Sequence, residues 1–189
     1  MSAALCTALV LLAWLTAMAG ERLPVRWRRP LALLVLVLLL LPWPVGVAHW
    51  LPSYLGHFSI VTILLALDRL GRAYGPGGWL RKQEVRKLAW LLPAVAIWFY
   101  PMSLGATALD PYALGFGDFR FSTALLLLGL YFWIGRDYGL CLMLVAAQVA
   151  WRLELLPSDN LWDYLLDPWL VIWSLVWLVR ARPRTATAD

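Results

Sequence analysis

Residues 119–156, "FRFSTALLLLGLYFWIGRDYGLCLMLVAAQVAWRLELL", hold two long apolar runs separated by a short polar link. The runs cover about residues 119–135 and 138–156, with Arg136 and Asp137 between them. Each run is close to the roughly 20 residues that an α-helix needs to cross the hydrocarbon core of a membrane. This stretch therefore predicts two antiparallel membrane helices joined by a tight turn.

Similar apolar runs occupy most of the remaining chain. The 189 residues are 62% hydrophobic with a mean hydropathy of +0.73, and only 14% are charged, whereas soluble domains contain about 25% charged residues. We therefore predict an all-α fold, a polytopic bundle of about seven transmembrane helices that forms a single integral membrane domain over residues 1–189. The other five helices are expected at about residues 3–19, 31–50, 53–68, 88–106 and 161–179, followed by a short basic tail at 180–189.

The first run, residues 3–19, has two possible interpretations. The triplet Ala17-Met18-Ala19 resembles the small-residue cleavage site of a signal peptide. However, no Lys or Arg precedes the run, and an arginine cluster that begins at Arg22 follows it at once. Cleavage would leave that cluster on the translocated side, against the positive-inside rule, so we predict a retained helix with its N-terminus outside.

The basic residues orient the predicted bundle. Alternating crossings place only Arg120 and Arg152 outside and the other basic residues at the cytoplasmic side, which also puts the C-terminus there. The net charge of +5 is distributed over short segments between apolar runs, so we expect contact with lipid and not with nucleic acid. Arginine outnumbers lysine, as in GC-rich bacterial genomes, which suggests a bacterial inner membrane. The predicted inside set comprises Arg22, Arg26, Arg28, Arg29, Arg69, Arg72, Arg81, Lys82, Arg86, Lys87, Arg136, Arg180, Arg182 and Arg184.

The basic loop at about residues 69–87 is the longest segment expected in the cytoplasm. Its second part, "WLRKQEVRKLAW", predicts an interfacial helix whose Arg and Lys side chains face anionic lipid headgroups. A docking site for a cytoplasmic partner is the alternative. Near the start of the loop, Arg72 lies four residues after Asp68 and can pair with it.

The stretch "SDNLWDYLLDPW", residues 158–169, places three aspartates four residues apart. Asp167-Pro168 has the pattern of a helix N-cap followed by proline at the first helical position. A helix that began at Pro168 would have only 12 residues up to Val179, roughly 18 Å against about 30 Å of hydrocarbon. We therefore favour a continuous or kinked helix from Asp159 or Leu161, with a short interfacial helix and a break at Asp167 as the alternative.

The predicted topology brings several polar residues to similar depths in the outer half of the membrane. Charged groups at such depth normally face a bundle interior or a wet cavity in pairs, so we predict a polar binding pocket in which Arg152 pairs with Asp163 or Asp167. Purely structural ion pairs and groups that merely face water at the interface are the alternatives. Neither a metal site nor a cofactor is expected, and catalytic residues cannot be assigned. The candidate pocket residues are His57, Arg120, Gln148, Arg152, Asp163 and Asp167.

Common catalytic motifs of the GxxxxGK, GxSxG and HExxH types are absent from the sequence. The sequence therefore favours a non-enzymatic accessory or scaffolding subunit in cell-envelope assembly, which would hold another membrane protein. A membrane-embedded enzyme that acts on a lipid or lipid-linked headgroup at the periplasmic face is the second hypothesis. A proton-coupled transporter that uses Asp167 in a proton relay is the third.

Overall fold

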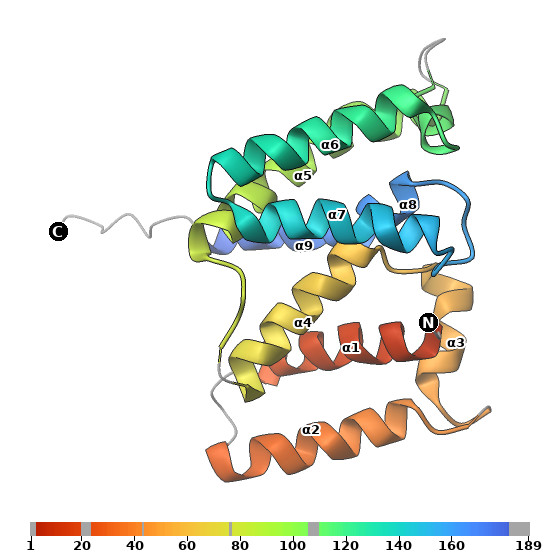
Figure 1. Cartoon of the computed structure of the whole chain (residues 1–189). Coiled ribbons are helices and arrows are strands. Elements are labelled where there is room, and N and C mark those ends of the chain that lie inside the picture. The colour runs from red at the N-terminus through yellow and green to blue at the C-terminus, as the bar shows by residue number, and fades with distance from the viewer. Residues whose placement is uncertain (1–2, 20–23, 43, 76, 106–109, 182–189) are drawn as a thin grey trace, which may run out of the picture.

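The computed structural model describes residues 3–19, 24–42, 44–75, 77–105 and 110–181. These residues form an all-α structure without strands (Figure 1). Arg22, Arg182 and Arg184, and the predicted tail beyond Ala181, lie outside the described residues. The helices are α1 Ala3–Ala19, α2 Val25–Leu39, α3 Val47–Leu55, α4 Ile60–Tyr74, α5 Lys82–Ser103, the 3₁₀ helix η2 Tyr112–Gly115, α6 Phe119–Ile134, α7 Tyr138–Arg152, α8 Trp162–Leu165 and α9 Pro168–Arg180.

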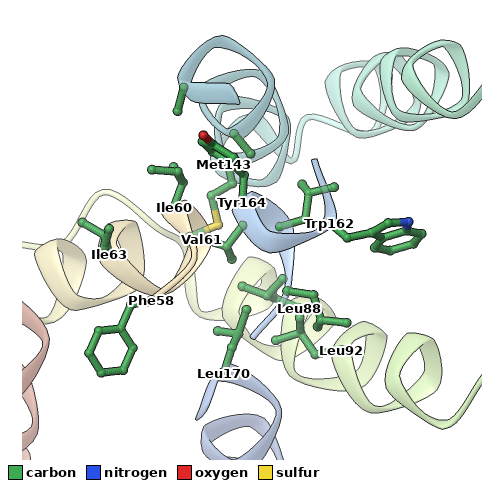
Figure 2. Packing of buried hydrophobic residues seen from close by; sticks show 14 of the residues in the cluster. Phe58, Ile60, Val61, Ile63, Leu88, Leu92, Met143, Trp162, Tyr164 and Leu170 are labelled. Atoms are coloured by element: carbon green, nitrogen blue, oxygen red, sulfur yellow. The ribbon is translucent and has the colours of Figure 1, made fainter. Parts of the chain in front are cut away.

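The core lies where α4, α5, α7, α8 and α9 meet. Figure 2 shows that Ile60, Val61, Met143, Tyr164 and Leu170 converge there from four of these helices. The predicted hairpin of residues 119–156 is present as α6 packed against α7, while α5 packs against α9. On the other side of α4, the core is extended by α1, which in turn contacts α2 and α3. Each central helix thus buries one face against its neighbours.

The run at residues 31–50, predicted as one helix, is divided in two. Helix α2 begins at Val25 and ends at Leu39, and α3 begins at Val47. Pro42 and Pro44 cause the interruption because proline lacks a backbone N–H and disfavours helical geometry in the residue before it. In Figure 1, α3 lies across the ends of α1 and α2, both of which it contacts.

The predicted continuous or kinked helix from Asp159 or Leu161 is wrong, because α8 and α9 are separated by two extended residues, and the alternative with a break at Asp167 is what forms. Helix α8 is a single turn, after which Leu166 (φ −136°, ψ 130°) and Asp167 (φ −136°, ψ 159°) are extended. Pro168 restricts the backbone of the residue before it to extended conformations. Asp167 then caps α9, whose first residue is Pro168.

Length and composition single out one stretch of the described chain that is long and apolar enough to cross a membrane. It is Trp162–Arg180, with 19 residues, and it includes the break between α8 and α9. Helix α1, over Ala4–Met18, and helices α6 and α7 are apolar but shorter.

The helix ends divide into two groups. In Figure 1 the C-terminal ends of α1, α4, α6 and α9 lie on the left with the N-terminal ends of α2, α5 and α7. We call this side the basic end, because it carries Arg26, Arg28, Arg29, Arg69, Arg72, Arg81, Lys82, Arg86, Lys87, Arg136 and Arg180. We call the opposite side the acidic end; its loops and helix starts carry Asp110, Asp118, Glu154, Asp159, Asp163 and Asp167.

Candidate functional site

Asp167 is a buried carboxylate that joins two helices. One oxygen, Oδ1, accepts a hydrogen bond from the backbone N–H of Leu170 at 2.9 Å and so caps α9. The other, Oδ2, accepts from the backbone N–H of Ser59 at 2.9 Å and from Thr62 Oγ1 at 2.5 Å, at the start of α4. The residue is only 5% exposed. One side chain therefore satisfies donors at the N-termini of α9 and α4, where backbone N–H groups lack helical partners.

Asp163 performs a similar task nearer the surface. Its Oδ2 accepts hydrogen bonds from the hydroxyl of Tyr112 at 3.0 Å and from Ser158 Oγ at 2.5 Å. Tyr112 belongs to η2, so this carboxylate ties the segment before α6 to α8. The Asp163 side chain is half-buried and does not lie free in solvent.

The loop between α7 and α8 is held by several further bonds. The Tyr164 hydroxyl accepts from the backbone N–H of Leu156 at 3.2 Å and lies 3.0 Å from the carbonyl oxygens of Leu156 and Ser158, to either of which it can donate. Asn160 Nδ2 donates to the carbonyl of Tyr112 at 2.8 Å, and Asn160 Oδ1 accepts from the backbone N–H of Trp162 at 2.9 Å. These bonds tie the loop between α7 and α8 to η2 and to the start of α8.

At Gly115, η2 and the loop between α7 and α8 lie in close contact. A Cβ atom at this position would lie 1.8 Å from Asn160 Oδ1 and 2.9 Å from Trp162 Cδ1. Asn160 cannot yield, because it is fully buried and bonded on both sides.

We expect Gly115→Ala to lower the free energy of unfolding by about 2 kcal/mol, the usual cost of overpacking. Thermal unfolding in detergent measures it, with exposed Ala113→Ser as the control; equal stability of the two variants would show that the contact relaxes freely.

Outside the predicted membrane crossings, the side chain of Tyr112 has the most strongly shifted pKa. Partial burial, and then the negative charge and hydrogen bond of Asp163, raise the pKa of Tyr112 from 10.0 to about 12. The folded protein therefore favours the neutral phenol. The associated stability is complete below pH 10 and is lost as the pH rises toward about 12.

We expect Tyr112→Phe to remove this alkaline component of the pH dependence. The check is unfolding between pH 9 and 12, about one unit below the usual tyrosine pKa to two units above it, with tyrosinate absorbance recorded in parallel. Exposed Tyr131 provides the control variant, Tyr131→Phe. If both variants keep the wild-type alkaline profile, the contact between Tyr112 and Asp163 does not govern it.

The six predicted pocket residues do not gather in one cavity. His57 is exposed between α3 and α4, and Arg120 is exposed on the first turn of α6. Gln148 donates to the carbonyl of Leu144 at 3.4 Å and lines an apolar groove between α6 and α7. Arg152 lines a separate polar hollow at the acidic end. The predicted pairing of Arg152 with Asp163 or Asp167 does not form, since no ion pair among the described residues includes Arg152. Both carboxylates accept hydrogen bonds from hydroxyl or backbone donors instead.

A second set of buried carboxylates lies at the basic end. Glu84, which is 1% exposed, accepts from the backbone N–H groups of Arg81 at 2.7 Å and Gly139 at 2.8 Å. Asp137, at the start of α7, accepts from the Arg81 guanidinium at 3.2 Å and pairs with Lys87. These bonds fasten the start of α5 to the turn between α6 and α7.

The pair expected between Asp68 and Arg72 is confirmed, with a 2.8 Å contact. Asp68 also accepts from the backbone N–H of Leu80 at 2.8 Å, and the Arg72 guanidinium donates to the Leu80 carbonyl. The roles of Glu84 and Asp137 were missed by the sequence analysis. Their signal was an isolated acid at the start of each helix, inside an otherwise basic segment, where a carboxylate is favoured by the helix dipole.

No family model, curated protein or solved structure matches this chain. Cys6 and Cys141 are both free thiols. Within the described ranges, no three His, Cys, Asp or Glu side chains are grouped as metal ligands.

Proposed function

We propose that this chain is a multi-pass bacterial inner-membrane protein of about seven crossings, with its N-terminus outside and its C-terminus in the cytoplasm. We further propose that it acts as an accessory or scaffolding subunit in cell-envelope assembly and holds another membrane protein. In this arrangement α3 lies at the outer surface and α8 with α9 forms the last crossing. The basic end faces the cytoplasm and contacts anionic lipid headgroups.

Two features support the membrane assignment. Large apolar side chains are exposed along several helices, as in Leu33 (63% exposed), Ile97 (77%) and Leu127 (62%), and such bands need lipid or protein to cover them. The fold also sorts the helix ends by charge: the described basic residues other than Arg120 and Arg152 lie at one end, as the positive-inside rule requires (Figure 1).

The observation that carries the accessory role is the occupancy of the buried acids. Asp68, Glu84, Asp137 and Asp167 are each at most 5% exposed, and each bonds backbone or cationic groups of a neighbouring segment. Side chains committed to joining helices serve architecture, whereas a catalytic base must reach the proton that it removes. The same occupancy weakens the transporter hypothesis, since a relay needs Asp167 to exchange protons.

Cysteine accessibility tests the topology. In a background in which Cys6 and Cys141 are replaced by serine, exposed Asp159 and Lys82 are replaced singly by cysteine. We expect an impermeant maleimide added to intact spheroplasts to label Asp159→Cys only, and Lys82→Cys to react only after lysis. Labelling of both from the same side would overturn the topology.

Native mass spectrometry of the gently extracted protein tests the accessory role. A second protein at fixed stoichiometry, retained in both wild type and Arg152→Gln, is the expected result. Isolation of the chain without any partner under conditions that preserve known membrane complexes would argue against this role.

One contact keeps the headgroup enzyme as a second candidate. Ser158 lines the polar hollow and donates a short hydrogen bond to Asp163, the arrangement in which a carboxylate accepts a proton from an attacking hydroxyl. Incubation of purified protein with envelope lipids distinguishes the candidates. Turnover that disappears in Ser158→Ala supports the enzyme, and unchanged lipids with wild-type protein support the accessory subunit.

A further inference from the structure

The acidic end contains a polar hollow of about 280 Å³ that the accessory role does not use. This is close to the lower bound of about 300 Å³ for small-molecule pockets, a size that suits a headgroup better than a larger ligand. The hollow lies where α7 passes into the loop before α8. Its lining comprises Phe116, Trp151, Arg152, Glu154, Ser158 and Asp159.

The charged side chains that line the hollow form no ion pairs within the described chain. They are Arg152, Glu154 and Asp159, and all three are exposed. The hollow therefore presents one guanidinium and two carboxylates at once. This contrasts with the buried acids elsewhere, each of which has its partners in the protein.

Glu154 is held in place by an unusual backbone conformation. Helix α7 ends with hydrogen bonds from Leu155 N–H to the Ala150 carbonyl and from Glu154 N–H to the Trp151 carbonyl, both 3.0 Å. This is the Schellman pattern, in which the residue at the Glu154 position is left-handed and usually glycine. Glu154 adopts φ 51°, a conformation that is costly for a residue with a Cβ atom.

The other wall is equally fixed. Trp151 Nε1 donates to the carbonyl of Asp159 at 2.8 Å, and Ser158 Oγ is bonded to Asp163. Trp151 and Phe116 are also among the residues that line the hollow, and aromatic side chains attract cations. The backbone positions of Glu154 and Asp159 are thus set before any ligand arrives.

We propose that this hollow binds the zwitterionic phosphoethanolamine headgroup of a membrane lipid. Arg152 contacts the phosphate, and Glu154 and Asp159 bind the primary ammonium between the aromatic rings. An anionic headgroup without an ammonium leaves two carboxylates uncompensated beside its phosphate, so the site selects against it. The lipid source rests on the proposed function, which places the acidic end at the outer surface of the membrane.

The test is native mass spectrometry of the full chain in detergent micelles, titrated with phosphatidylethanolamine or phosphatidylglycerol. We expect wild type to prefer phosphatidylethanolamine by about fivefold or more, the scale of one partly exposed ion pair. Arg152→Gln should weaken this binding by about fivefold, and Glu154→Gly should abolish the preference.

Glu154→Gly is informative because glycine suits the left-handed position, so the fold is expected to be kept or stabilised while the carboxylate is lost. Arg136→Gly is the matched control. Arg136 has φ 59° at the end of α6, with the same hydrogen-bond pattern, but lies at the basic end away from the hollow. This control should leave the lipid preference unchanged.

Three results would overturn the proposal. The first is equal retention of both lipids, and the second is a preference that survives Glu154→Gly. The third is an equal loss of phosphatidylethanolamine binding in Arg152→Gln and in Arg120→Gln, the control for an exposed arginine outside the hollow. Soluble glycerophosphoethanolamine separates the sources: displacement at the concentration of the intact lipid would assign the hollow to a free zwitterion. The micelle titration does not depend on orientation, so failure of the cysteine labelling would overturn the proposed topology while leaving headgroup recognition to be judged by itself.

Discussion

Asp167→Ala is expected to be the most destabilising single substitution at the acidic end, with a loss of about 3 kcal/mol in the free energy of unfolding. The reason is that one carboxylate satisfies the backbone N–H groups of Ser59 and Leu170 and the hydroxyl of Thr62. Removing it leaves buried donors at the starts of two helices without partners, and each such group costs about 1–3 kcal/mol. Reversible unfolding in mixed detergent micelles measures the change.

Asp159→Ala is the matched control for Asp167→Ala. The Asp159 side chain is exposed, and its bond to Trp151 uses the backbone carbonyl, which the substitution keeps. We expect a change of at most about 0.5 kcal/mol. Asp167→Asn should fall between the two, because the amide keeps one acceptor oxygen and turns an N–H₂ group toward donors. If Asp167→Ala and Asp159→Ala unfold alike, Asp167 does not join α4 to α9.

Glu84→Ala is expected to cause a comparable loss of about 3 kcal/mol at the basic end. Glu84 is almost fully buried and accepts from the backbone N–H groups of Arg81 and Gly139, which belong to different helical segments. Its removal also leaves Arg81 with Asp137 as its only described acidic partner. Hydrogen exchange should show faster opening of the first turns of both α5 and α7, because the same carboxylate serves both.

Lys82→Ala controls for the position, since Lys82 is exposed on the same turn of α5. It should change stability by at most about 0.5 kcal/mol. Glu84→Gln separates charge from geometry: it keeps an acceptor for one N–H and should retain part of the stability. Exchange that accelerates only in α5 would contradict the assignment of Glu84 as a link between helices.

The site was less predictable from the sequence than the helices. The predicted topology placed Gln148, Arg152 and Asp167 at similar depths, but depth says nothing about the direction of a side chain around its helix axis. Gln148 faces a groove between α6 and α7, whereas Asp167 points at the start of α4. Arg152 does not pair with Asp163 or Asp167 for that reason, and because hydroxyl and backbone donors already bind the oxygens of both carboxylates.

The sequence by itself determined the helical class and the position of most helices, because hydrophobic runs and prolines act through neighbours along the chain. It showed the N-cap pattern of Asp167-Pro168, although the length argument favoured a helix that ran through it. It also marked the local pair of Asp68 and Arg72. Only the tertiary structure decided that Asp167 serves α4 as well as α9, that Glu84 accepts a hydrogen bond from Gly139, and that Arg152, Glu154 and Asp159 line one hollow. Those contacts depend on how helices rotate and pack against one another, which is set by side-chain shape across segments distant in sequence.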